Sequence, residues 1–161
     1  MFQFQWAAYV VGKYVVSPGG VVQLYKASLK YSSEEIKRAL TLFTDETHFP
    51  IHVHCSHGKD RTGMVVALVL AICGVPEEQI VLDYAKSEAG LAPVHDALAK
   101  DIQRSGLSDE FMHTPPQNMR DLFNYLKKQY GSIPEYLESI GFDTKAQEKV
   151  RSILCASLPK A

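Results

Sequence analysis

Residues 54–63 read His54-Cys55-Ser56-His57-Gly58-Lys59-Asp60-Arg61-Thr62-Gly63. The residues before them, 50–54, alternate β-branched side chains with histidines, and this alternation predicts a short strand. The residues after them, 61–73, are apolar on nearly every side and predict a buried helix. We therefore expect a tight loop that carries Cys55 from the end of a strand to the start of a helix.

The loop has the composition of an anion-binding site. Backbone N–H groups from Ser56 to Arg61 can turn inward as a nest, and the helix N-terminus adds partial positive charge. Gly58 permits a backbone geometry that a Cβ would obstruct, and Arg61 offers a planar fork for two phosphate oxygens. The same field favours a thiolate, so the pKa of Cys55 should lie well below the usual value of about 8.5. Such a thiolate could attack a bound phosphate in line, and water would then hydrolyse the cysteinyl-phosphate.

Hydrophobic spacing predicts that most of the remaining chain is helical. The predicted helices span residues 21–29, 32–43, 76–88, 94–104, 115–130, 133–140 and 146–154. In the first of them, one face carries Val21, Leu24, Tyr25 and Leu29. Residues 14–16 are expected to form a short extended piece.

Length and charge narrow the class of protein. The chain has 161 residues, which suits one domain, 1–161. Seventeen Lys and Arg against eighteen Asp and Glu exclude a generally basic surface, so we expect no nucleic-acid partner.

Three cysteines indicate no disulfide framework and suit a reducing compartment. The longest apolar run, 64–73, is about half of what a bilayer span needs. We expect a soluble, cytoplasmic protein without a membrane span.

The ten-residue loop resembles the signature of the cysteine-dependent protein tyrosine phosphatase superfamily. Its form is most similar to the branch of tyrosine and dual-specificity phosphatases that includes bacterial enzymes with phosphoinositide activity. The resemblance continues downstream in Gly74-Val75-Pro76, Asp83-Tyr84-Ala85, Ser87-Glu88 and the stretch from Tyr130-Gly131-Ser132 to Gly141-Phe142. It implies an α/β fold with a small central, mostly parallel sheet packed by helices and a strongly helical C-terminal half.

The resemblance also implies roles for the loop residues. Cys55 would be the nucleophile and Arg61 the phosphate binder. Thr62 would hydrogen-bond the Cys55 sulfur and help it leave in the second step, while His54 would position and tune the thiolate. The substrate would be bound by Ser56, His57, Gly58, Lys59, Asp60 and Arg61. Lys59 and Asp60 would line the pocket mouth, where Lys59 could contact a second phosphate, such as an inositol ring carries.

The resemblance implies no cofactor, because the superfamily mechanism needs no metal. His52, His54 and His57 are close in sequence. Strand alternation and the loop should turn their rings in different directions, so we expect no metal site.

The general acid is less clear, because the leaving group needs a proton. Typical members draw it from an Asp on a mobile loop well before the cysteine, but the one Asp before Cys55 here is Asp45. Either Asp60 is the acid, which we favour, or the acid lies in sequence that this chain lacks. An Arg-Asp-x-Gly-Gly element and several strands usually precede the cysteine. Nothing here matches them, so we expect the N-terminal strands to be missing and regard the chain as a candidate truncated form.

Three functions are compatible with the loop. The first is phosphomonoester hydrolysis on phosphotyrosine or phosphoserine/threonine proteins, or on phosphoinositides with transient contact to a membrane surface. The second is an RNA 5′-triphosphatase, which often carries a histidine at the position of His57, although Lys59-Asp60 departs from that pattern. The third is a catalytically impaired pseudophosphatase that only binds phosphorylated partners.

Overall fold

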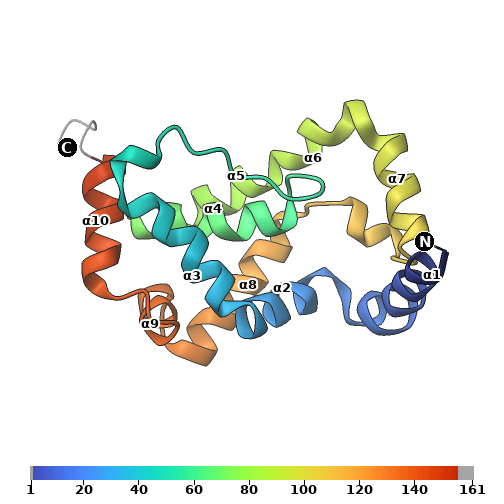
Figure 1. Ribbon diagram of the computed structural model, residues 1–161, viewed down its shortest axis with the longest axis horizontal. Helices are drawn as coiled ribbons and strands as arrows, with labels where there is room; N and C mark the ends of the chain where they lie inside the picture. The colour runs from blue at the N-terminus through green and yellow to red at the C-terminus, as the bar shows by residue number, and fades with distance from the viewer. Residues whose placement is uncertain (1, 156–161) are drawn as a thin grey trace.

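The computed structural model describes residues 2–155, and most of them are helical (Figure 1). The α-helices are α1 (Phe2–Val11), α2 (Gly20–Tyr31), α3 (Ser33–Thr41), α4 (Asp60–Ile72), α5 (Glu77–Ala85), α6 (Ser87–Leu91), α7 (His95–Arg104), α8 (Pro116–Tyr130), α9 (Ile133–Ser139) and α10 (Thr144–Cys155). A π-helical turn η1 (Gly12–Val16) and five 3-10 turns join them: η2 (Ser17–Gly19), η3 (Leu42–Thr44), η4 (Glu46–His48), η5 (Ala92–Val94) and η6 (Asp109–Met112). No helix in residues 2–155 is both long enough and apolar enough to cross a membrane.

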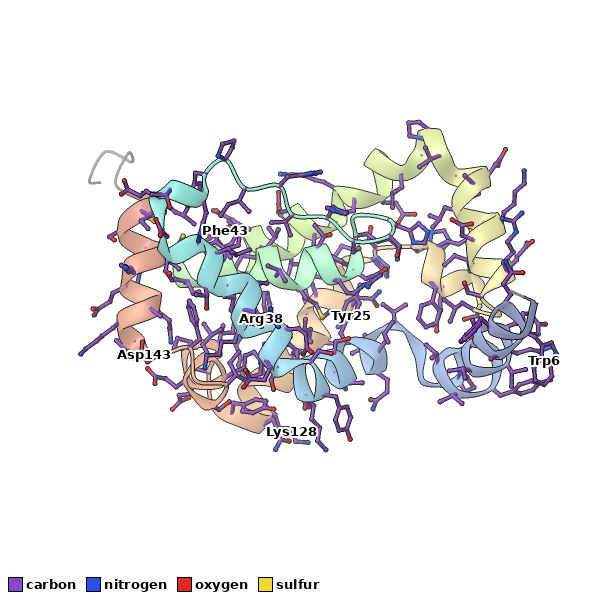
Figure 2. All side chains as sticks on the ribbon, viewed as in Figure 1. Trp6, Tyr25, Arg38, Phe43, Lys128 and Asp143 are labelled. Carbon is purple, nitrogen blue, oxygen red and sulfur yellow. The ribbon has the colours of Figure 1, made fainter. Side chains whose placement is uncertain are left out.

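Helix α4 lies in the middle of the fold. It contacts α2, α3, α5, α9 and α10, so it is covered from several directions. A helix that is apolar on nearly all sides needs such cover, because any side left in water would expose apolar surface. Helix α8 packs against α2, α5 and α9 and closes the core from another side. In Figure 2, Tyr25 lies near the centre of the molecule, whereas Trp6 and Lys128 lie at its rim.

The predicted helices are confirmed, with small shifts at their ends. The segment predicted at 61–73 is α4, and the segments at 115–130 and 133–140 are α8 and α9. The segment predicted at 76–88 is divided into α5 and α6. The division falls at Lys86, whose N–H donates to the Asp83 carbonyl three residues back.

The expected α/β fold is wrong, because residues 2–155 contain no β-strand and hence no central parallel sheet. Residues 51–54 are non-helical, and their side chains alternate between half-buried and exposed, as the strand prediction required. A strand also needs a neighbour to receive its backbone hydrogen bonds, and no segment of the described chain pairs with this one. Residues 14–16, expected to be extended, belong to η1.

Candidate active site

The loop of residues 55–59 joins the non-helical segment 51–54 to the N-terminus of α4 (Figure 1). Helix α4 begins at Asp60, which places Arg61 in its first turn. Gly58 has a φ of +70°, and a Cβ at this position would meet no atom within 4 Å. The backbone conformation, rather than a lack of space, therefore requires glycine here.

Neighbouring donors and burial act in opposite directions on the pKa of the Cys55 thiol. Burial raises its pKa, but the Thr62 hydroxyl and the backbone N–H groups of Thr62, His57 and Gly58 outweigh burial. The net result lowers the pKa of Cys55 from 9.0 to about 6, so the thiolate predominates at neutral pH. The sequence predicted this direction.

The Thr62 hydroxyl has one evident role. Its oxygen is buried and meets the geometry of an ordinary hydrogen bond with no group in the described part of the chain. It nevertheless lies close enough to the Cys55 sulfur to lower the pKa of that thiol. A hydroxyl hydrogen rotates freely about its C–O bond, so it can turn toward a thiolate.

Arg61 and His57 connect the loop to its surroundings. Arg61 is exposed, and its Nη2 donates to Ser56 Oγ at 2.8 Å, so the guanidinium lies back along the loop. His57 Nε2 lies 3.6 Å from Asp101 Oδ2 on α7. The contact between Arg61 and Ser56 thus connects the two ends of the loop, and the contact between His57 and Asp101 connects the loop to α7.

A cavity of about 400 Å³ adjoins the loop. Its polar wall consists of Ser56, His57, Asp60 and Arg61. Its opposite wall is mostly apolar and is lined by Leu24, Tyr25, Met64, Ile102, Leu107 and Phe111. The cavity therefore has a polar end, which carries both Asp60 and Arg61, and an apolar body; Cys55 is not among the residues that line it.

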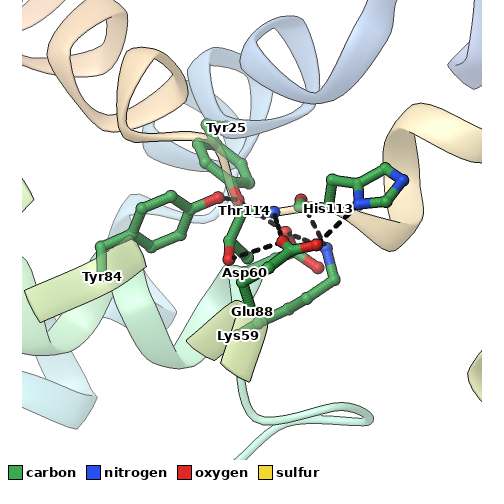
Figure 3. A network of polar contacts seen from close by, with 7 residues as sticks. All are labelled: Tyr25, Lys59, Asp60, Tyr84, Glu88, His113 and Thr114. Carbon is green, nitrogen blue, oxygen red and sulfur yellow. Dashed lines mark hydrogen bonds and ion pairs between the residues drawn. The ribbon is translucent and has the colours of Figure 1, made fainter. Parts of the chain in front are cut away.

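Lys59 and Asp60 form the buried base of the loop (Figure 3). The Lys59 side chain is 0% exposed, and its Nζ lies 3.0 Å from Asp60 Oδ1 and 3.5 Å from the His113 carbonyl oxygen. The Tyr25 hydroxyl, from α2, donates to the same Oδ1 at 2.5 Å. Lys59 thus points into the interior instead of toward the pocket mouth. Its predicted contact with a second phosphate stays a prediction that this orientation does not support.

More polar groups surround this pair. The Tyr84 hydroxyl on α5 lies 2.7 Å from the Tyr25 hydroxyl. Glu88 on α6 binds His113 Nδ1 at 2.7 Å and accepts from the Thr114 N–H at 2.6 Å. Burial raises the pKa of both tyrosines, so both hydroxyls keep their protons. Sequence reasoning placed Tyr25 on a buried helix face but gave its hydroxyl no role. The spacing of apolar residues along one helix cannot reveal which residue elsewhere in the chain will accept a hydrogen bond from that hydroxyl.

The structure also shows where two other candidate residues, Asp45 and His54, lie. Asp45 lies on an exposed turn, where its carboxylate accepts from the Thr47 N–H and hydroxyl. His54 is exposed, and its ring stacks on His52 with centroids 5.4 Å apart. The expectation that these two rings face different directions is wrong, because residues two apart on an extended segment share a side. No cluster of metal-ligating side chains occurs in residues 2–155.

The low pKa of Cys55 predicts the pH dependence of its alkylation. The rate with iodoacetamide, followed by mass spectrometry of the Cys55 peptide, should rise with a midpoint near pH 6 as the thiolate forms. Thr62→Val should move the midpoint up toward 9.0, because it removes one donor to the sulfur. Cys73 provides an internal control, since burial raises its pKa to about 11. A Cys55 midpoint close to 9 in the unaltered protein would contradict this account.

Comparisons with known proteins identify the family of the chain. A family model described as the tyrosine phosphatase family matches residues 17–156. The chain is similar to the triple specificity protein phosphatase PtpB of Mycobacterium tuberculosis, with 28% identity over 120 residues, which cover 65% of this chain and 44% of the relative. It is also similar to a tyrosine-protein phosphatase of Nostoc commune, with 25% identity over 147 residues, which cover 83% of this chain and 49% of the relative.

The chain spans about half the length of these two curated relatives. The family match, in contrast, covers most of the chain and includes the whole loop together with α2 to α10. The chain belongs to the tyrosine phosphatase family.

Proposed function

We propose that the protein hydrolyses phosphate monoesters through a cysteinyl-phosphate intermediate. The observation that supports this most is the stabilised thiolate. Three backbone N–H groups and one hydroxyl lower the pKa of Cys55 to about 6, and the guanidinium of Arg61 binds Ser56, the next residue of the loop. A thiolate that is ionised at neutral pH is the form that acts as a nucleophile.

Each step of the proposed reaction has a group in the loop. The Cys55 thiolate attacks phosphorus, so the S–P bond forms as the bond to the leaving oxygen breaks. The backbone donors and Arg61 stabilise the negative charge on the equatorial oxygens. Water then attacks the phosphorus, the S–P bond breaks, and the Thr62 hydroxyl donates to the departing thiolate. Inorganic phosphate is the product.

Asp60 is the proposed general acid. Its side chain is 22% exposed and lines the cavity beside Arg61. Both donors found for it, Tyr25 and Lys59, use Oδ1, whereas Oδ2 has no hydrogen-bond partner in residues 2–155. Oδ2 is therefore available to carry the proton that the leaving oxygen takes.

The cavity supports a substrate with an apolar body behind its phosphate. An aromatic ring of phosphotyrosine or the apolar part of a phosphoinositide would contact the wall formed by Leu24, Ile102 and Phe111. We therefore propose phosphorylated proteins or phosphoinositides as substrates. The three cysteines are free thiols, and a nucleophilic Cys55 requires a reducing compartment such as the cytoplasm.

A substrate panel tests this function. Phosphate release from a phosphotyrosine peptide, a phosphothreonine peptide, a phosphoinositide and triphosphate-ended RNA would be measured with and without EDTA. We expect release from at least one monoester, inhibition by vanadate and no effect of EDTA. Cys55→Ser should lower the rate by several orders of magnitude, and Cys73→Ser, a half-buried thiol outside the loop, should leave it unchanged. Phosphate release by Cys55→Ser at the normal rate, or release from RNA alone, would contradict the proposal.

The role of Asp60 has its own test. Asp60→Asn should lower kcat on phenyl phosphate by about 10²- to 10⁴-fold, the usual contribution of a general acid. Binding of vanadate should persist, because Arg61 and the loop N–H groups remain. Turnover of phenyl phosphate close to that of the unaltered protein would show that the acid is another group.

A further inference from the structure

We propose that Tyr25 is a positioning residue for Asp60: its hydroxyl holds Oδ1 so that the proton of the general acid resides on Oδ2, facing the cavity. This inference rests on the proposed role of Asp60 as general acid. It concerns a side chain outside the 54–63 loop, on α2, 35 residues before Asp60 in the sequence.

The contact is short and protected from water. The Tyr25 hydroxyl donates to Asp60 Oδ1 at 2.5 Å, at the short end of the range for O–H groups bound to carboxylates. The Tyr25 side chain is 0% exposed and Tyr84 is 4% exposed. Hydrogen bonds in such surroundings are stronger than in water, because little solvent competes for the donor.

The neighbouring tyrosine fixes the direction of the contact. Because the Tyr25 hydrogen points at Asp60, the Tyr84 hydroxyl must be the donor in the 2.7 Å contact between the two hydroxyls. The chain of donors therefore runs from Tyr84 to Tyr25 to Asp60. Gly63 makes room for it, since a Cβ at Gly63 would lie 2.9 Å from the Tyr84 ring. The two rings meet edge to face, with centroids 6.4 Å apart.

The consequence for Asp60 follows from the chemistry of a carboxyl group. A protonated carboxyl keeps its hydrogen on one oxygen and accepts on the other. Oδ1 already receives a phenol hydrogen and an ammonium hydrogen, from Tyr25 and Lys59, so a proton on Oδ1 would compete with both donors. The proton is thus directed to Oδ2. A fixed Oδ1 also limits rotation of the carboxyl plane, which keeps the acid aimed at the leaving oxygen.

The test compares leaving groups. In Tyr25→Phe, kcat on phenyl phosphate, whose leaving group needs a proton, should fall about 10-fold, in keeping with loss of one buried hydrogen bond. On 4-nitrophenyl phosphate, whose leaving group needs little assistance, kcat should stay within about 2-fold, and KM for both should change little. A purely structural defect would lower both rates together.

Tyr136→Phe is the matched control. Tyr136 is also 0% exposed, and its hydroxyl donates to the Leu29 carbonyl at 3.0 Å, outside the site. The control should leave the ratio of the two rates unchanged, although it removes a comparable buried hydrogen bond. Equal losses on both substrates in Tyr25→Phe, or no loss on either, would overturn the positioning role.

A proton NMR spectrum separates failure of this inference from failure of the proposed function. The short contact should give a downfield, slowly exchanging hydroxyl resonance that disappears in Tyr25→Phe and in Asp60→Asn but persists in Tyr136→Phe. Absence of the resonance from the unaltered protein would overturn the inference. If the resonance follows this pattern while neither ester is turned over, the contact is upheld and the proposed function fails.

Discussion

The loop is anchored by one fully buried lysine, Lys59. A fully buried ammonium is tolerated only when it is paired and hydrogen-bonded, because removing a charge from water costs several kcal/mol. Lys59 has 0% exposure and meets that condition through Asp60 and the His113 carbonyl. Asp60 in turn is held by Tyr25. Residues 55–59 therefore cannot lift away from Asp60 and the segment before α8 without exposing or unpairing this lysine.

The anchor and the nucleophile belong to the same short loop. Lys59 is buried next to Asp60 and Tyr25, while the N–H groups of His57 and Gly58 help to lower the pKa of Cys55. A glycine at positive φ is needed between them, since the backbone reverses direction within a few residues. The rigid base keeps the donors in place before any anion binds. Such preorganisation is what makes electrostatic stabilisation of a transition state effective.

Local patterns predicted the helices and the chemistry of the loop. The apolar faces of α8 and α9 follow the 3.6-residue period. The spacing of Cys55 and Arg61 along the chain can be read from the sequence alone. The absence of a sheet from residues 2–155 could not be predicted in the same way, because a strand depends on a partner that its own residues do not specify. Residues 51–54 have strand-like alternation but no neighbour in the described chain. The direction of Lys59 was also beyond sequence reasoning, since a lysine on a loop can face water or a buried carboxylate.

If Cys55 is the nucleophile, a phosphate bound to its sulfur during turnover is the most direct evidence. The protein would be mixed with 4-nitrophenyl phosphate, quenched in acid within milliseconds and digested, and the Cys55 peptide examined by mass spectrometry. We expect a peptide heavier by one phosphoryl group, with the phosphate on sulfur, and no such species in Cys55→Ser. Turnover without any phosphorylated Cys55, or a phosphate found on another residue, would contradict it.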